Sequence, residues 1–78
     1  MAKAQRWVIV GRHGLYVGQT LTRAAAIAEH VHCFRGKEGV PADISEFTNG
    51  RRLDPDQVKA WKWRKRCGDR VVRAIISF

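Results

Sequence analysis

Residues 54–78 read DPDQVKAWKWRKRCGDRVVRAIISF and contain the clearest helix signals in the chain. Asp54 is a good N-cap, because its carboxylate accepts hydrogen bonds from the free amides of the first turn. Pro55 suits the first helical position, and Gln57, three residues after the cap, completes a capping box. Gly68 follows the last turn as a left-handed terminator. The segment therefore predicts a capped helix that ends just before Gly68.

This predicted helix carries a basic stripe. At roughly 100° per residue, Lys59, Lys62 and Arg66 fall within about 60° of one another. Trp63 borders the stripe on one side, and Trp61 belongs to an apolar patch on the other. The two indoles therefore cannot face a single core from a regular helix. Either the helix is clamped between two layers, or one indole lies at the surface.

The end of the chain predicts a strand. Its apolar residues alternate onto one face, and the opposite face is mixed; the apolar set is Val72, Ala74, Ile76 and Phe78. This pattern is typical of a strand in the centre of a small sheet. We expect it to pair with the first strand, Arg6–Val10, which is rich in β-formers.

The N-terminal region predicts a β-hairpin. Leu15–Gly18 is the second strand, and the four residues Gly11–Gly14 form a glycine-bounded loop. Arg12 lies at the loop tip, either as a solvated turn residue or as a basic tip that contacts phosphate. The first helix follows with Thr22 as its preferred cap, and Gly36 ends it. Its apolar spacing is that of an amphipathic helix, with Ala24, Ile27, Ala28, Val31 and Phe34 on one side.

The weakest structural signals lie in Lys37–Leu53. Pro41–Phe47 is interpreted as one or two helical turns, and the competing interpretation is a short hairpin turning at Asn49-Gly50. The helical turn is preferred because the segments flanking the turn are too short for a ladder. Arg51 and Arg52 form a small basic cluster before the main helix.

These elements predict a single α+β domain over residues 1–78. The expected order is strand, strand, helix, short helix, helix, strand. It gives a three-stranded antiparallel sheet, made of the N-terminal hairpin and the C-terminal strand, with two main helices on one face. A hydrophobic content of 45% excludes a disordered tail.

The net charge of +8 over 78 residues indicates an anionic partner or surface. No apolar run approaches the ~18 residues of a membrane span, and no signal-peptide core follows Met1–Arg6. We therefore expect a cytoplasmic protein that does not enter a membrane.

Metal and catalytic chemistry have little support in the sequence. His30 and Cys33 share a helical face, and Cys67 and His13 would complete a ligand set, but the spacings match no common zinc module. The two cysteines are better explained as small buried apolar residues. His30 and His32 are expected at the surface or half-buried. We expect no metal, no cofactor, no catalytic residue and no enzymatic activity.

Residues 15–20, LYVGQT, followed by a helix that ends in Glu29-His30, resemble the second motif of the GIY-YIG nucleases. The resemblance implies a small three-stranded core. The opening strand Arg6–Val10 lacks the tyrosine of that family's first motif, and the family's helix arginine would fall near Ala26. No acidic residue matches the metal-binding glutamate. The resemblance therefore implies a degenerate, inactive relative that keeps affinity for nucleic acid.

A second resemblance is to short reading frames of bacteriophages and prophages. It is carried by Tyr16-Val17-Gly18, by Thr22-Arg23 with Ala26-Ile27 and His30, and by Arg66–Val72. It implies an accessory phage protein that acts in the cytoplasm of a bacterial host.

The favoured function is nucleic-acid binding, with DNA preferred, because lysine and arginine neutralise phosphates and an exposed indole stacks on bases. The predicted binding residues are Arg12, Arg51, Arg52, Lys59, Lys62, Trp63, Arg66 and Arg70. The alternative is an inhibitor or adaptor that binds a host protein, because tryptophan and arginine dominate many interfaces. The sequence leaves both a monomer and a homodimer open.

Overall fold

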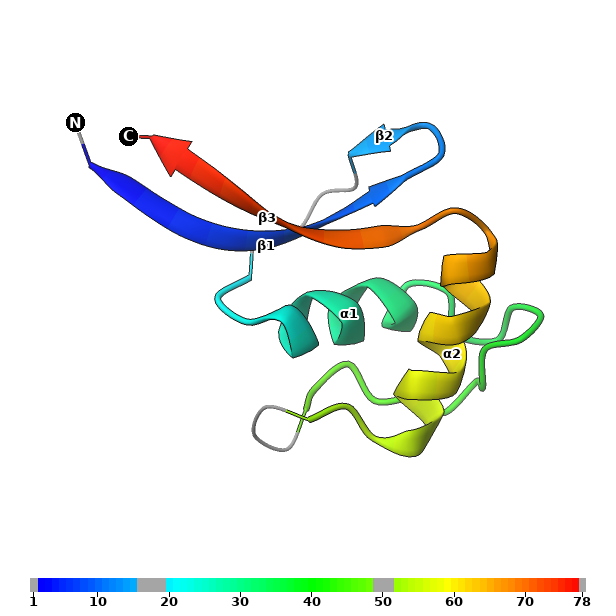
Figure 1. Ribbon diagram of the computed structural model, residues 1–78. Helices are drawn as coiled ribbons and strands as arrows, with labels where there is room; N and C mark the ends of the chain where they lie inside the picture. Colours follow the sequence, from blue (N-terminus) through cyan, green and yellow to red (C-terminus); the bar gives the residue numbers. More distant parts are fainter. Residues whose placement is uncertain (1, 16–19, 49–51, 78) are drawn as a thin grey trace.

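The computed structural model describes residues 2–15, 20–48 and 52–77. Five elements follow one another along the chain: strands β1 (Lys3–Gly11) and β2 (Gly14–Leu15), helices α1 (Arg23–His32) and α2 (Pro55–Arg66), and strand β3 (Arg70–Ser77) (Figure 1). The α+β class and the two main helices are confirmed.

A long antiparallel ribbon of β1 and β3 forms one layer of the molecule. Its register runs without interruption from Lys3 opposite Ser77 to Val10 opposite Arg70, so the first and last strands pair as predicted. The start of β1 and the end of β3 consequently lie side by side (Figure 1). Ile9 on β1 and Val71 on β3 lie opposite each other and pack toward the helices.

The prediction of a three-stranded sheet is wrong. β2 adds only the pairs Val10 with Leu15 and Gly11 with Gly14, so it closes a turn at the end of β1 rather than forming a third strand. Farther along, Trp7 pairs with Thr20, whereas a continuous ladder would bring residue 18 opposite Trp7. The pair of Trp7 with Thr20 is therefore two residues out of register with the β1–β2 pairs. The predicted strand Leu15–Gly18 extends into residues 16–19, which lie outside the described part.

The expected central position of the last strand is also wrong. Among the described residues β3 pairs with β1 alone, so β3 is at an edge of the two-stranded sheet. Its sequence nevertheless resembles that of a strand buried on both faces, because apolar residues occur on each face: Val72, Ala74 and Ile76 on one, Val71 and Ile75 on the other.

Helix α1 begins as predicted at the N-cap Thr22, whose hydroxyl accepts a hydrogen bond from the Ala25 amide at 3.1 Å. It ends at His32, earlier than the predicted Gly36, and turns follow. Its apolar face forms the centre of the core, where Ile27 and Val31 are fully buried against Ile9 and Trp61.

Helix α2 has the predicted capping box. The backbone amide of Gln57 donates to the Asp54 carboxylate at 2.8 Å, and the backbone amide of Asp54 donates to the side-chain oxygen Oε1 of Gln57 at 3.0 Å. At the other end, Gly68 has φ +102°, and the Asp69 amide donates back to the Arg64 carbonyl at 3.1 Å. The start and the end of this helix are thus determined by local chemistry.

The predicted short helix at Pro41–Phe47 is wrong, because the described residues in this range form turns and bends. The side chain of Gln57, which is fully buried, donates to the carbonyls of Ser45 at 2.6 Å and Phe47 at 3.1 Å. These carbonyls therefore bond to a side chain of α2 rather than to amides of a helical turn. The two hydrogen bonds from the Gln57 side chain attach this non-helical loop to α2.

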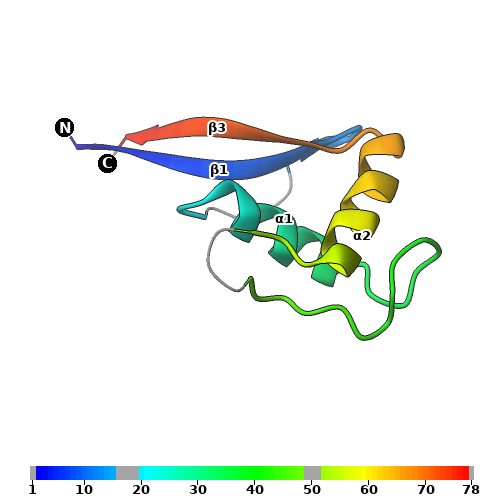
Figure 2. The same cartoon turned by 60° about the horizontal axis from the view of Figure 1, so that its bottom comes forward.

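Both helices lie on the same side of the β1–β3 ribbon (Figures 1 and 2). α1 runs beneath the ribbon, and α2 crosses the end of α1 with its last turn leading into β3. The helical layer therefore covers one end of the ribbon, and the ribbon extends beyond it toward the chain ends (Figure 1).

Candidate nucleic-acid interface

The predicted basic stripe of α2 lies on the outside of the molecule. Lys59, Lys62 and Arg66 are all exposed. They lie roughly opposite the buried residues of the same helix, because successive residues are about 100° apart. The buried set is Gln57, Ala60, Trp61 and Arg64. The stripe extends about 10 Å along the helix, at 1.5 Å per residue.

No ion pair joins Lys59, Lys62 or Arg66 to a carboxylate within the described residues. Lys65, which was not predicted as a binding residue, is exposed on the same helix. The charge of the C-terminal third is strongly one-sided: residues 57–78 contain seven lysines and arginines against a single carboxylate, Asp69. The exposed cations of α2 are therefore available to an external anion.

That single carboxylate is used inside the protein. Asp69 Oδ2 accepts a hydrogen bond from Arg64 Nε at 2.6 Å and lies 2.7 Å from His30 Nε2. All three side chains are at most one-tenth exposed. The Arg64 guanidinium also lies over the Phe34 ring, 3.8 Å from its centroid. Arg64 is thus the one cation of α2 that faces the core.

Burial lowers the pKa of His30, although its bond to Asp69 acts in the opposite direction. For Asp69, burial acts to raise the pKa, but the hydrogen bonds from Arg64 and His30 outweigh it and lower the pKa. At neutral pH these directions favour a carboxylate at Asp69 and a neutral ring at His30, whose Nε2 then donates to Oδ2. This network joins α1, α2 and the start of β3. Sequence reasoning missed it, although His30 follows Ile27 at core spacing.

The two tryptophans of α2 point in different directions, as their helical spacing predicts. Trp61 is 4% exposed and belongs to the core. Trp63 is half-buried, and its ring is edge-on to the Phe34 ring at 6.3 Å between centroids. A Cβ added at Gly39 would lie 2.6 Å from two atoms of the Trp63 ring, so the loop backbone is pressed against the indole. Trp63 is therefore part of the packing between α2 and the loop.

Two further predicted residues lie at the end of α2. Arg70 is exposed at the start of β3 and pairs with Val10. Arg12, also exposed, has its Cβ 3.8 Å from the position that a side chain at Gly68 would occupy. The tip of the N-terminal turn thus meets the junction between α2 and β3, and it adds a cation next to the last turn of the helix.

The remaining predicted residues lie elsewhere. Arg52 is exposed two residues before the cap of α2, and its neighbours in a shallow pocket include Asp54 and Phe47. A helix of 12 residues is about 18 Å long, so Arg52 is separated from the α2–β3 junction by roughly that distance. Arg51 lies outside the described residues.

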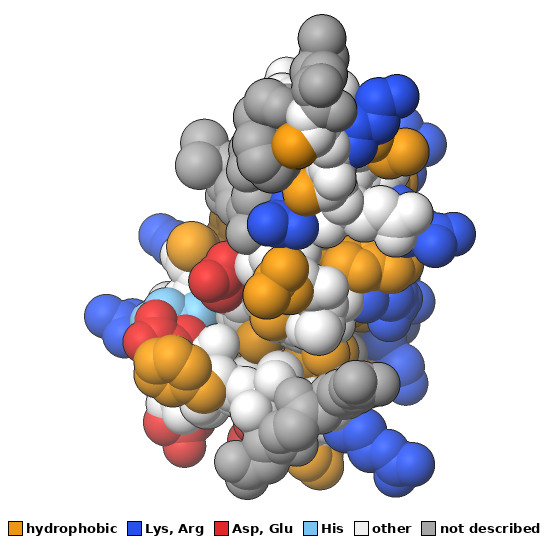
Figure 3. Space-filling view, turned by 90° about the vertical axis from the view of Figure 1, so that its left-hand side faces the viewer, with side chains coloured by type: hydrophobic (Ala, Val, Ile, Leu, Met, Phe, Trp, Pro, Cys, Tyr) orange, Lys and Arg blue, Asp and Glu red, His pale blue; other side chains and the backbone are white. Residues whose placement is uncertain are grey.

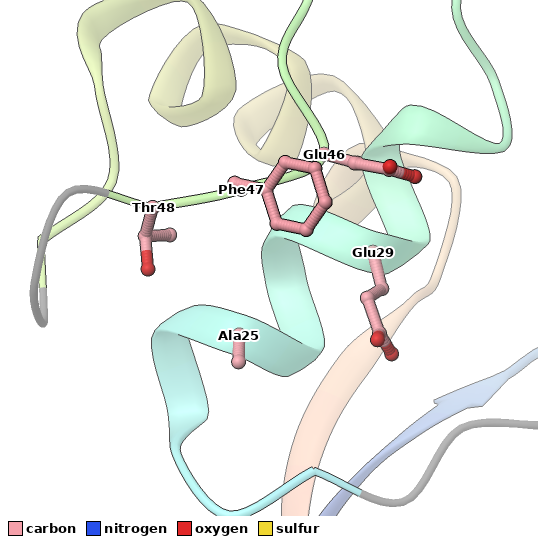
Figure 4. Close-up of a pocket in the computed structure, with 5 residues that line it drawn as sticks. All are labelled: Ala25, Glu29, Glu46, Phe47 and Thr48. Carbon is pink, nitrogen blue, oxygen red and sulfur yellow. The ribbon is translucent and has the colours of Figure 1, made fainter.

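Acidic side chains lie on a different part of the surface from most of the cations. Figure 3 shows lysines and arginines along the right-hand margin of one face, and acidic side chains toward the left with some further basic side chains beside them. A pocket of about 370 Å³ is lined by Ala25, Glu29, Glu46, Phe47 and Thr48. In Figure 4 the Phe47 ring projects over α1, and the Glu46 and Glu29 side chains both lie to its right. Phe47 is 74% exposed.

Comparisons with protein-family models, with curated proteins and with solved structures found no match. The three-stranded core implied by the GIY-YIG resemblance differs from the β1–β3 ribbon, and Tyr16–Gln19 of that motif lie outside the described residues.

Within the described residues, no group of three or more histidine, cysteine or acidic side chains is placed to hold a metal ion. No helix in that part of the chain combines the length and the apolar character needed to span a bilayer.

Proposed function

We propose that the protein binds nucleic acid, with duplex DNA as the preferred form, through a basic face. This face consists of Lys59, Lys62 and Arg66 on α2, with Arg12 and Arg70 at the end of the helix. The observation that carries the proposal is the exposure of Lys59, Lys62 and Arg66 opposite the buried side of α2, while Asp69, the one carboxylate after Asp56 in the described residues, is bonded to Arg64 and His30.

The mode of binding proposed here is recognition of the phosphate backbone. Lysine and arginine neutralise phosphates and release counterions, which supplies affinity without sequence selectivity. Base stacking by Trp63 is not included, because its ring packs against Gly39 and Phe34. Binding without catalysis fits the predicted role of a phage accessory protein in the cytoplasm of a bacterial host.

The test is a fluorescence-anisotropy titration of duplex DNA over a range of salt concentrations. Five phosphate contacts give an expected slope of log K against log salt of about −4 to −5. Replacing Lys62 and Arg66 by glutamine should make the slope shallower by roughly 2. The matched control replaces Lys3 and Arg23, which are exposed and distant from the end of α2, and removes the same charge.

If both double variants lost the same affinity and the same salt slope, binding would depend on net charge alone. That result would reject the basic face as the binding site. Millimolar or weaker binding of duplex and single strands at low salt would reject the function itself.

A protein partner is the second candidate function, as an inhibitor or adaptor acting on a host protein. The observation that favours it is Phe47, which is 74% exposed and lines a pocket with Glu29 and Glu46. Replacing Phe47 by serine should then abolish a nuclease-resistant complex, and the Lys62 and Arg66 double variant should retain it.

A further inference from the structure

Strand β3 has an open edge. It pairs with β1 on one side, and within the described residues no strand pairs with its other side. In Figure 2 both helices lie on the β1 side of the ribbon, and neither runs along the outer edge of β3. An edge strand of this kind presents a row of unpaired backbone amides and carbonyls that are able to bind another strand.

The edge also lacks the features that usually prevent such pairing. Proteins protect free edges with proline, charged side chains (above all lysine), bulges or very short strands. The charged residues of β3 are Arg70, at its first position, and Arg73, at its centre. β3 is eight residues long, contains no proline or lysine, and keeps one continuous register with β1. Its central cation, Arg73, has its guanidinium carbon 5.7 Å from the centroid of the Trp7 ring on β1, so the charge is directed away from the edge.

The side chains of β3 suit a strand with neighbours on both sides. Val72, Ala74 and Ile76 share the face turned away from the helices, and Ile75 on the opposite face is 66% exposed. Only a few such large apolar side chains are this exposed among the described residues, and Ile75 is the one on this strand.

We propose that β3 pairs antiparallel with β3 of a second copy of the chain. The product is a four-stranded sheet in the order β1, β3, partner β3, partner β1, with a two-fold axis perpendicular to the sheet. This symmetry places the helices of both copies on the same side of the sheet. The interface is isologous, because the same strand is used by both copies.

Charge and size together favour one register. With Ala74 opposite the partner's Ala74, the small side chains meet at the axis, and Val72 lies opposite the partner's Ile76. On the other face, Arg73 lies opposite the partner's Ile75, which removes the exposed isoleucine from water. A shift that puts Arg73 opposite the partner's Arg73 would bring like charges together, which is destabilising.

A second copy is favoured over an unrelated strand because the apolar pattern of β3 is complementary to itself in this register. The net charge of +8 on each copy opposes association, so added salt should strengthen the dimer. Salt weakens binding to nucleic acid. The dimer and the proposed nucleic-acid interface therefore respond to salt in opposite directions, and one can fail without the other.

The first test measures mass by sedimentation equilibrium at low salt and at about 1 M salt. The wild type should approach twice its 8.9 kDa mass, with more dimer at high salt. Ile75→Lys should raise the dissociation constant at least about tenfold, because it places two cations in opposition. Leu21→Lys, at a position that is 74% exposed, is the matched control and should dimerise like the wild type.

The second test checks the register by disulfide formation. In a background with Cys33 and Cys67 replaced by serine, Ala74→Cys should form a covalent dimer on mild oxidation, and Ala42→Cys on an exposed loop should not. A wild-type protein that stays monomeric at millimolar concentration, both at low and at high salt, overturns the proposal. This holds even if another molecule is found to bind the edge of β3. Equal cross-linking at positions 74 and 42 overturns it as well.

Discussion

At the scale of single residues, the pair His30–Asp69 makes stability depend on pH. The pKa of each group is lower in the folded protein than its ordinary value, 6.5 for His30 and 3.8 for Asp69. The unfolded chain therefore binds more protons below these values, and acid favours unfolding. The contribution of His30 is complete above pH 6.5 and is lost as the pH falls below it. The contribution of Asp69 is lost only below pH 3.8.

We therefore expect the melting temperature to fall as the pH is lowered from 7.5 to 5. The slope of the free energy of unfolding attributable to one histidine is at most about 1.4 kcal/mol per pH unit. Thermal denaturation followed by circular dichroism is the measurement. His30→Gln should be less stable at pH 7.5 but should show a flatter profile. Parallel profiles for the two proteins would contradict this origin of the acid sensitivity.

A second prediction at this scale concerns Gly39. Its φ of +82° and the Trp63 ring, 2.6 Å from an added Cβ, both oppose a side chain. Gly36 has a similar φ of +77° but nothing within 4 Å of an added Cβ, so it is a matched control. We expect Gly36→Ala to cost about 1 kcal/mol from backbone strain, and Gly39→Ala to cost about 1–3 kcal/mol more. Urea denaturation measures the free energy of unfolding of both variants. Equal losses of stability would show that the Trp63 ring moves aside at no cost.

At the scale of elements, Gln57 links α2 to the loop before it. One end of its amide accepts from the Asp54 backbone, and the other donates to two loop carbonyls. Gln57→Glu keeps the acceptor but turns a carboxylate toward those carbonyls. We expect it to cost about 2–4 kcal/mol, against about 1 kcal/mol for loss of the cap in Asp54→Ala.

Chemical denaturation of both variants, with exposed Asp56→Asn as a control, separates the two roles of Gln57. Similar costs for Gln57→Glu and Asp54→Ala would mean that the loop contributes nothing through this amide.

The elements that the sequence predicted well are those determined by neighbouring residues. Asp54, Gln57 and Gly68 bound α2 through contacts within a few positions, and Thr22 does the same for α1. The loop at 41–48 was predicted wrongly because its carbonyls bond to a side chain ten or more positions away. The bond from His30 to Asp69 spans 39 positions, which no local pattern reveals.

At the scale of the whole molecule, the sequence predicted which strands pair but not how many make the sheet. The alternation in β3 correctly indicates a strand, and its apolar character indicates neighbours on both sides. The edge position of β3 follows from its pairing with β1 alone among the described residues, and no pattern within β3 shows that its other side has no neighbour. The basic stripe of α2 was predictable because helical geometry alone places Lys59, Lys62 and Arg66 together.

The pairing of Lys3 with Ser77 has a consequence for synthesis of the chain on the ribosome. β1 is translated first, but the strand with which it pairs along its length, β3, is translated last. Contacts so distant along the chain slow folding, because a large loop must close before they form. Until β3 has been translated, the described partners of β1 are therefore limited to β2 and Thr20, and most of its backbone has no strand to pair with.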